Sequence, residues 1–256
     1  MKIDLFNDNF ENAKVYQLPK ADLIVADIPY NIGKDAYASR AEWWNGREYR
    51  NGENKERADK RFFNTDENFN IENFFKFCIR YLKDEPKKGS GSPSLLVFCS
   101  FEQIAEVIDS AYKVGLKKYI PIILIKNNSS QVLKANMKIV GACEYCLLFY
   151  RNKLPKFNNV MEDGKKHMIK NWFEFKKDPD VERIHPTQKP VNLLEKLIRI
   201  LTDENDVIID PVAGSGSTLI ASYNLNRNCY GFEVDRNYYN KAIKLLSERG
   251  VLDGSR

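Results

Sequence analysis

Short runs of apolar residues alternate along the chain with segments in which apolar residues recur at every third or fourth position. The runs predict strands, and the segments with helical spacing predict amphipathic helices. The expected strands are 2–6, 23–27, 95–99, 120–126, 145–151, 207–210 and 229–233. The expected helices are 71–82, 101–114, 191–201, 217–225 and 236–249. This alternation predicts an α/β fold, in which a doubly wound, mostly parallel seven-stranded sheet forms a single domain, residues 1–256.

Two long stretches interrupt the alternation. Residues 31–70 are polar, rich in Asn, Gly, Arg and Glu, and contain Trp43 and Trp44. Residues 153–185 are basic and aromatic. Loops of this length are uncommon in compact domains unless they are functional or disordered. We therefore interpret 31–70 as an inserted polar loop and expect a functional role for both stretches.

The distribution of charged residues along the chain is better evidence for a polyanionic partner than the net charge is. The net charge of +5 comes from 40 basic and 35 acidic residues, which is weak evidence for a polyanionic partner. Between residues 113 and 143, however, there are six lysines and no acidic residue. A surface of one sign suits a phosphate backbone, although a solubilising face has the same composition.

Cysteine usage and hydropathy indicate a reduced, cytoplasmic protein. The five cysteines are scattered through apolar stretches and imply no disulfide framework. No apolar run approaches the ~20 residues of a membrane span, and the first residues lack the layout of a secretory signal. Cys143 and Cys146 have the spacing of metal ligands but no second pair, so no metal is expected.

A glycine-rich turn joins a predicted strand to a predicted helix. Such a turn lets a ligand approach the backbone and exposes free N–H groups at the start of the helix. An acid at the end of the next strand, Glu233, can accept both hydroxyls of a ribose. A dinucleotide motif would place a third glycine at Leu219, so a nucleoside cofactor without phosphate fits better. The candidate residues in the turn are Asp210, Pro211, Ala213, Gly214, Gly216 and Thr218.

A second motif follows the apolar run 23–26. It consists of Asp27, Ile28, Pro29 and Tyr30 at the carboxyl end of a predicted buried strand, where doubly wound sheets bind ligands. The Asp27 carboxylate and the Ile28 carbonyl are acceptors, and Tyr30 offers an aromatic face. Two acceptors beside an aromatic ring suit an exocyclic amino group on a planar base.

Together these motifs resemble those of the DNA amino-methyltransferases, whose catalytic motif is Asp/Asn/Ser-Pro-Pro-Tyr/Phe and whose cofactor motif is Phe/Pro-x-Gly-x-Gly. Here the catalytic motif comes first and the cofactor motif follows about 180 residues later, an order that resembles the β class. The segment His185-Pro-Thr-Gln-Lys-Pro190 is also typical of that class. The resemblance spans nearly the whole chain. It implies a class I methyltransferase-like, circularly permuted fold with S-adenosylmethionine as cofactor.

The resemblance also implies a reaction, the methylation of N6 of an adenine flipped out of double-stranded DNA. Asp27 and the Ile28 carbonyl would accept from the amino group, and Tyr30 would stack on the base. Asp8, beside Asn7, lies where the family places a side chain on the cofactor's adenine ring. Thr187 and Lys189 would lie near the cofactor's carboxylate, although a helix cap and a surface charge are the respective alternatives. The expected cofactor-binding set is Asp8, Asp27, Thr187, Lys189, Asp210, Pro211, Ala213, Gly214, Gly216, Thr218, Glu233 and Val234.

One residue departs from the family pattern, because Ile28 stands where the family has its first proline. Isoleucine still supplies the carbonyl, but it adds an N–H and relaxes the backbone. We expect activity to survive with a less rigid turn.

Two other functions remain open. An N4-cytosine methyltransferase has the same motifs, although serine usually replaces the aspartate in such enzymes. A DNA- or RNA-binding relative without activity would keep the fold, but Asp27, Tyr30 and Glu233 are all present. A homodimer and a cognate restriction endonuclease are possible partners within the family.

DNA contact is expected in residues 127–185, which we interpret as the target-recognition region. Lysines there would contact phosphates, and the amides of Asn127 and Asn128 would read bases. The tryptophans of the 31–70 loop compete for this role. The candidate residues are Lys126, Asn127, Asn128, Lys134, Lys138, Trp43 and Trp44.

The lysine run generates the first testable prediction. Neutralising Lys134 and Lys138 together should weaken binding to all DNA sequences and lower the slope of log affinity against log salt by about 2. Replacing Asn127 or Asn128 should instead change the preference among sites by roughly 1–3 kcal/mol. Fluorescence anisotropy at several salt concentrations measures both effects. An unchanged slope would place the DNA on the 31–70 loop.

Overall fold

The computed structural model describes residues 1–30, 69–89, 91–127, 132–134, 139–160, 164–176, 178–185 and 188–252, with the backbone alone for 132–134 and 139–140. Trp43, Trp44, Asn128, Lys138 and Thr187 lie outside the described residues, and so does most of the inserted loop. The predictions made for them, and for the side chain of Lys134, stay predictions.

The described strands form an eight-stranded sheet and a separate pair. All seven expected strands are present, and β7 alone in the large sheet runs antiparallel to its neighbours. The large sheet has the order β1 (Ile3–Phe6), β10 (Asn228–Phe232), β9 (Val207–Asp210), β2 (Leu23–Asp27), β3 (Ser94–Cys99), β7 (Cys143–Tyr150), β4 (Lys118–Lys126) and β8 (Trp172–Phe175).

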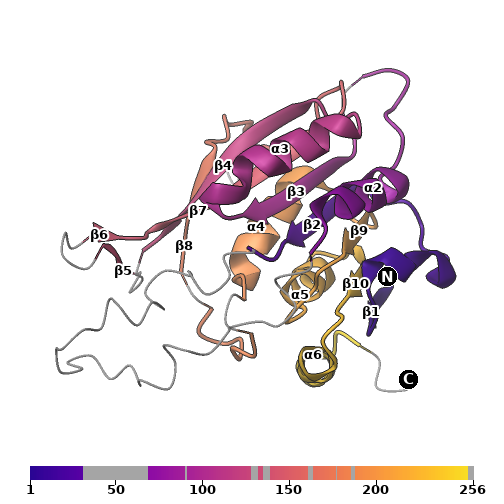
Figure 1. The fold of residues 1–256 in the computed structure, drawn as a ribbon, viewed down its shortest axis with the longest axis vertical. Helices are drawn as coiled ribbons and strands as arrows, with labels where there is room; N and C mark the ends of the chain where they lie inside the picture. The colour runs from indigo at the N-terminus through magenta and orange to yellow at the C-terminus, as the bar shows by residue number, and fades with distance from the viewer. Residues whose placement is uncertain are drawn as a thin grey trace.

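Helices cover both faces of the sheet (Figure 1). Successive strand residues point to opposite faces, so Leu95 and Val97 join one core cluster while Leu96 and Phe98 join the other. No helix in the described part of the chain is long and apolar enough to cross a membrane. One face carries η1 (Phe10–Tyr16), α2 (Ile71–Tyr81) and α3 (Ile104–Lys113, after η5, Phe101–Gln103), and the other carries α4 (Val191–Leu201), α5 (Ser217–Asn224) and α6 (Arg236–Glu248).

The strand β8 was not expected. Its sequence, Trp-Phe-Glu-Phe, lies in the stretch 153–185, where only Phe175 of the strand is buried. Its backbone pairs in parallel with Ile123–Lys126 of β4 at the edge of the sheet. Because edge strands are held by pairing rather than by burial, the hydrophobic pattern gives little sign of them.

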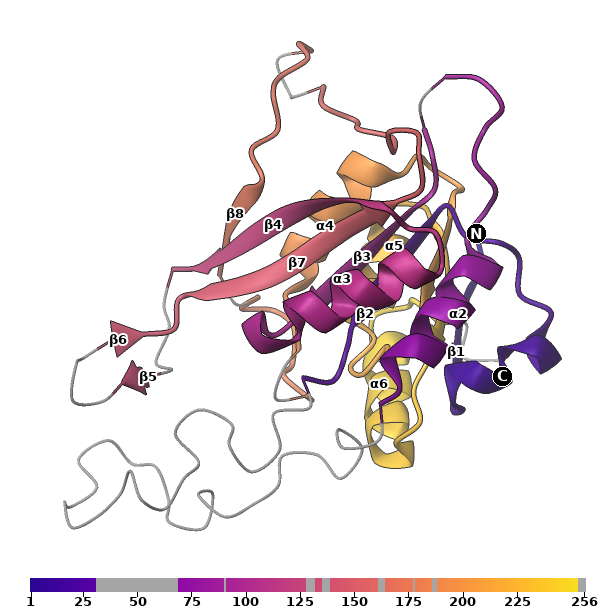
Figure 2. The same ribbon diagram turned by 45° about the horizontal axis from the view of Figure 1, so that its top comes forward.

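The described strands of the region 127–185 lie in two sheets. β7 and β8 belong to the large sheet, and the small pair β5 (Val132–Lys134) and β6 (Ile139–Val140) extends beyond the ends of β4 and β7 (Figure 2). Lys134 lies on β5 in this pair, whereas Lys126 lies at the end of β4.

The strand order brings the two sequence motifs together. β2 pairs with β9, with Leu23 opposite Ile208 and Ile24 opposite Ile209. The chain continues from β2 toward β3 but from β9 toward β10, so the order reverses between β2 and β9. Doubly wound sheets bind ligands at such a reversal, outside the carboxyl ends of the strands. Asp27 and Asp210 end the two strands that flank it.

Candidate active site

Asp27 presents one engaged and one open carboxylate oxygen. Its Oδ2 accepts a hydrogen bond from Nζ of Lys189 at 2.7 Å. Its Oδ1 is buried and has no hydrogen-bond partner among the described residues. Buried polar atoms without partners are rare in folded proteins and each calls for an explanation. An open acceptor at the carboxyl end of β2 is suited to a ligand N–H.

The turn after Asp27 is held on both sides. Ile28 is 1% exposed, and its N–H donates to the Phe98 carbonyl at 3.2 Å, which extends the pairing of β2 with β3. The additional N–H of isoleucine is therefore satisfied. The Pro29 carbonyl accepts from Nε2 of the buried Gln103 at 2.9 Å. Sequence reasoning missed Gln103, since a glutamine at the start of a helix carries no signal of its contacts.

Lys189 lies inside the site. It is 7% exposed, so the alternative of a surface charge is wrong. Besides its bond to Asp27, Nζ donates to the Tyr30 hydroxyl at 3.3 Å and lies 3.4 Å from Oε2 of Glu144. Its predicted place beside the cofactor's carboxylate stays a prediction.

Glu144 is the second acid of the site, and sequence reasoning missed it. Its Oε1 forms an ion pair with Nζ of Lys126 at 2.5 Å. The available signal was a lone acid at the start of an apolar strand, directly after the acid-free run. Lys126 was expected to contact DNA. In the structure its ammonium is bound to Glu144, so its contact with DNA stays a prediction.

The two cysteines that flank Glu144 and Tyr145 point apart. Cys143 is exposed and Cys146 is buried. Residues three positions apart in a strand face opposite ways, so this spacing separates the two thiols.

Burial and ion pairing act together on the pKa values of this cluster. Burial raises the pKa of Asp27, although the charge of Lys189 opposes the rise. Burial lowers the pKa of Lys189, but the charges of Asp27 and Glu144 outweigh it and hold that pKa well above its usual value. Burial also raises the pKa of Glu144, and Lys189 and Lys126 reverse the effect to leave it lowered. Lys189 and Glu144 are therefore charged at neutral pH.

Glu233 directly follows β10 and accepts hydrogen bonds that hold the glycine-rich turn. Its Oε2 accepts from the Gly214 N–H at 2.9 Å, and its Oε1 accepts from the Asp235 N–H at 2.7 Å. Gly214 and Gly216 have φ of +52° and +77°, values that favour glycine. A Cβ on Gly231 would lie 2.8 Å from Leu219. The glycine that lets α5 approach the sheet is thus on the strand rather than on the helix.

Asp210 and Glu233 are buried acids without cationic partners. They are 4% and 8% exposed, and no lysine or arginine of the described residues pairs with them. Burial raises both pKa values to about 7, and the hydrogen bonds from Thr218 and from Gly214 oppose the respective rises. Such carboxyls fit a ligand that brings hydroxyl or ammonium donors.

The other predicted cofactor residues lie around this edge. Asn7 of the β1 end donates to the Glu233 carbonyl at 2.9 Å. The Asp8 carboxylate instead accepts from Tyr16 and Asn12, at 2.8 and 2.7 Å. Val234 is exposed, whereas Pro211 and Ala213 are buried under the turn.

The segment before α4 packs on the glycine-rich turn. The His185 ring lies 4.4 Å from the Tyr238 ring, and a Cβ added to Gly214 would lie 3.9 Å from it. Burial lowers the pKa of His185 to about 4. A cap of α4 was the alternative role for Thr187. The N–H of Val191, the first residue of α4, donates to Asp178.

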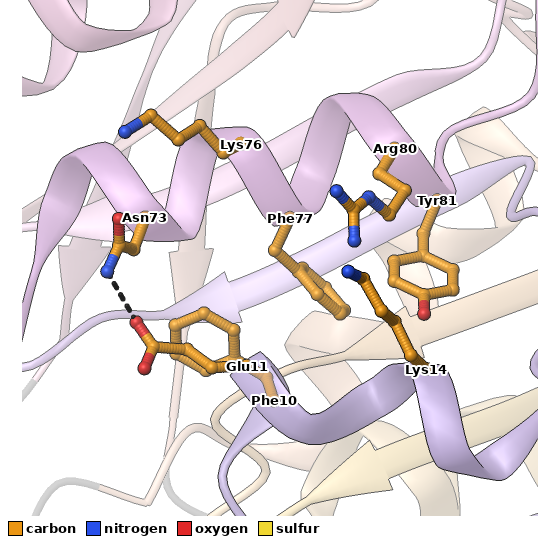
Figure 3. A pocket seen from close by; sticks show the side chains of 8 residues that line it. All are labelled: Phe10, Glu11, Lys14, Asn73, Lys76, Phe77, Arg80 and Tyr81. Atoms are coloured by element: carbon orange, nitrogen blue, oxygen red, sulfur yellow. Dashed lines mark hydrogen bonds between the residues drawn. The ribbon is translucent and has the colours of Figure 1, made fainter.

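A surface hollow of about 180 Å³ lies elsewhere, between η1 and α2 (Figure 3). Asn73 donates to Glu11 across it at 2.8 Å, and the basic side chains at its rim are Lys14, Lys76 and Arg80. It shares no residue with the cluster around Asp27 or with the glycine-rich turn.

Comparisons with known sequences point to one family. The family model for DNA methylases of the N6/N4 type matches residues 21–244. The type II methyltransferase M.HinfI of Haemophilus influenzae is 28% identical over 95% of this chain and 68% of its own length. M.BglII of Bacillus subtilis is 39% identical over 26% of this chain, and M.HindIII of Haemophilus influenzae is 45% identical over 24%. Those two alignments span only 18% and 20% of the relatives' lengths.

Solved structures share the fold. The complex of M1.HpyAVI with S-adenosylmethionine superposes with a TM-score of 0.66 at 22% identity, covering 95% of this chain and 98% of that one. The cytosine-N4-specific PvuII DNA methyltransferase gives 0.66 at 15% identity, covering 100% and 88%.

The raised pKa of Glu233 predicts a pH-dependent cost in stability. Its folded pKa of about 7 exceeds the ordinary 4.5, so the folded state loses stability as the pH rises from 4.5 to 7. Glu233→Gln should reduce this loss by about 1–3 kcal/mol. Urea unfolding across that pH range measures it. Glu248→Gln, at an exposed pair on α6, should keep the wild-type dependence, and a Glu233→Gln protein with the full wild-type loss would contradict the prediction.

Proposed function

The chain belongs to the N6/N4 DNA methylase family, and on that premise we propose that it transfers a methyl group to N6 of an adenine flipped out of double-stranded DNA. S-adenosylmethionine is the cofactor of the family. The observation that carries the proposal is the buried, unpartnered Oδ1 of Asp27 beside the Ile28 backbone.

The open acceptor suits the chemistry of an amino group. An exocyclic nitrogen is a poor nucleophile because its lone pair is delocalised into the ring. Hydrogen bonds from the amino group to Oδ1 and to the Ile28 carbonyl would turn that lone pair out of conjugation. Because the site is buried, such acceptors act more strongly than they would in water. The cofactor supplies an electrophilic methyl on a sulfonium. Methyl transfer would form the N–C bond, break the S–C bond and release one proton from the nitrogen, for which Oδ1 of Asp27 would be an acceptor.

The base itself requires a binding surface. A base inside a duplex is out of reach and must be extruded. Tyr30 follows Asp27 closely, and the bond from Lys189 fixes its hydroxyl. Burial raises the pKa of Tyr30, so its ring stays a neutral phenol. Stacking on such a ring is worth roughly 1–3 kcal/mol, which offsets part of the unstacking cost.

Two buried acids support the assignment of the cofactor edge. Glu233 would accept from the ribose hydroxyls, and Asp210 would place negative charge toward a cationic cofactor. The partly exposed Gly214 would present its backbone to the methionine part, whereas Gly216 packs against Leu246. Charge-assisted hydrogen bonds of this kind are the strong ones. Val234 adds an exposed apolar surface beside Glu233.

The choice of adenine over cytosine rests on Asp27, because the N4-cytosine members of the family usually have serine there. The decisive experiment is mass spectrometry of nucleosides from DNA of cells that express the protein, with a vector control. Detection of N6-methyladenine would support the proposal. Detection of N4-methylcytosine would show that the target base is cytosine. If neither were found, the protein would be a DNA-binding relative without activity. Long-read sequencing of the same DNA would report the recognition site.

Removing the open acceptor should stop the chemistry without emptying the cofactor site. Asp27→Ala should lower single-turnover methyl transfer by at least about 100-fold, while the dissociation constant for S-adenosylmethionine stays nearly unchanged. Glu233→Ala is the matched control, because it should weaken cofactor binding through loss of a charged acceptor. Calorimetry and labelled-methyl transfer measure the two effects. An Asp27→Ala protein that retains turnover would refute the assignment.

A further inference from the structure

Four charged side chains of alternating sign lead from the edge of the predicted DNA-contacting region to the open acceptor. Lys126 of β4 pairs with Glu144 of β7 at 2.5 Å, and Glu144 lies 3.4 Å from Lys189. Lys189 in turn bonds to Asp27 of β2 at 2.7 Å. Lys126, Glu144 and Asp27 belong to three strands of the large sheet, and Lys189 lies in the segment before α4.

The buried ammonium of Lys189 is shared between two acids. A buried charge is tolerated only when it is paired and its donors are satisfied. An ammonium has three donors; Lys189 donates to Asp27 and Tyr30, and its contact with Glu144 is an ion pair at 3.4 Å. If Asp27 were its sole acid, nothing would restrain Lys189 from occupying both carboxylate oxygens. The second acid gives Lys189 a fixed position that does not depend on Asp27.

The anchoring continues outward to β4. Glu144 is held by Lys126 through Oε1, so its Oε2 is the oxygen directed to Lys189. The Lys126 side chain is only 24% exposed, which leaves its ammonium inside the network.

We propose that Glu144 is a positioning residue, which Lys126 anchors and which holds Lys189 so that only Oδ2 of Asp27 is engaged. Oδ1 then stays open for the amino group of the target base. The identity of that group rests on the proposed function, whereas the order of the network does not.

The proposal predicts opposite effects at Asp27 for two variants. In Glu144→Gln, Lys189 has Asp27 as its only carboxylate, so the pKa of Asp27 should fall. In Lys126→Met, Glu144 has Lys189 as its only cation and draws it away, so the pKa of Asp27 should rise. The titratable and charged groups that face Asp27 are Lys189, Glu144, Tyr30, Cys99, Cys146 and Asp210.

The double variant separates relay through Glu144 from a direct effect of Lys126. If Lys126 acts only by anchoring Glu144, then Lys126→Met should change nothing in a Glu144→Gln background. The readout is the titration of the Asp27 carboxyl by ¹³C NMR of aspartate-labelled full-length protein, with the signal assigned from Asp27→Asn. Glu248→Gln is the control and should keep the wild-type midpoint.

Activity provides a second, independent readout. Glu144→Gln should lower the rate of methyl transfer by about 10-fold to 100-fold, with cofactor affinity unchanged. The acid limb of its pH–rate profile should move to lower pH together with the NMR midpoint. Glu144→Asp, which keeps the charge on a shorter side chain, should recover part of the rate.

The possible outcomes distinguish failure of the positioning role from failure of the proposed function. Equal Asp27 midpoints in the wild type and both single variants, or additive shifts in the double variant, would overturn the positioning role. If wild-type protein methylates no DNA while the midpoints move as expected, the proposed function fails and the network stands. If Lys126→Met changes only DNA affinity and its salt slope, Lys126 is a phosphate contact and the anchoring is refuted.

Discussion

A single buried ammonium, that of Lys189, sets the geometry of the candidate site. Two acids and a phenol surround it, and they come from β2, from the turn after β2 and from β7. Removing Lys189 would leave the Asp27 carboxylate without a cationic partner among the described residues, which is costly in a low-dielectric interior. The position of α4 relative to the sheet is therefore coupled to the orientation of Asp27. The same hydrogen bond engages Oδ2 of Asp27 and leaves Oδ1 without a partner among the described residues.

The two acids at the cofactor edge differ from Asp27 because no cation of the described residues neutralises them. Asp210 and Glu233 are buried without cations, and burial raises both pKa values to about 7. Such acids cost stability as the pH rises through neutrality, because the folded state must desolvate their charges. Acids kept in this condition by a fold are suited to a ligand that brings its own donors. Proteins accept local losses of stability of this kind at functional sites.

The family model establishes the family of the chain, whereas the target base depends on the catalytic motif. The DNA methylase model covers residues 21–244 and establishes the family. Relatives of this fold include one named for N4 of cytosine, so the target base is a question for the aspartate of the catalytic motif and for direct analysis of DNA. The Ile28 departure from the family pattern costs no buried hydrogen bond, since its N–H finds the Phe98 carbonyl.

The sequence determined seven strands of the large sheet, the helices α2 to α6 and the two motifs, because apolar periodicity and glycine-rich turns are local properties of the chain. It placed Asp27 and Glu233 at strand ends and anticipated the α/β fold. It did not reveal the pairing of β8, the contact of Gln103 with the Pro29 carbonyl, or the buried place of Lys189 between Asp27 and Glu144. Those features depend on which elements become neighbours. Only the tertiary structure decides that, because a charge in the sequence carries no mark of the partner that will neutralise it.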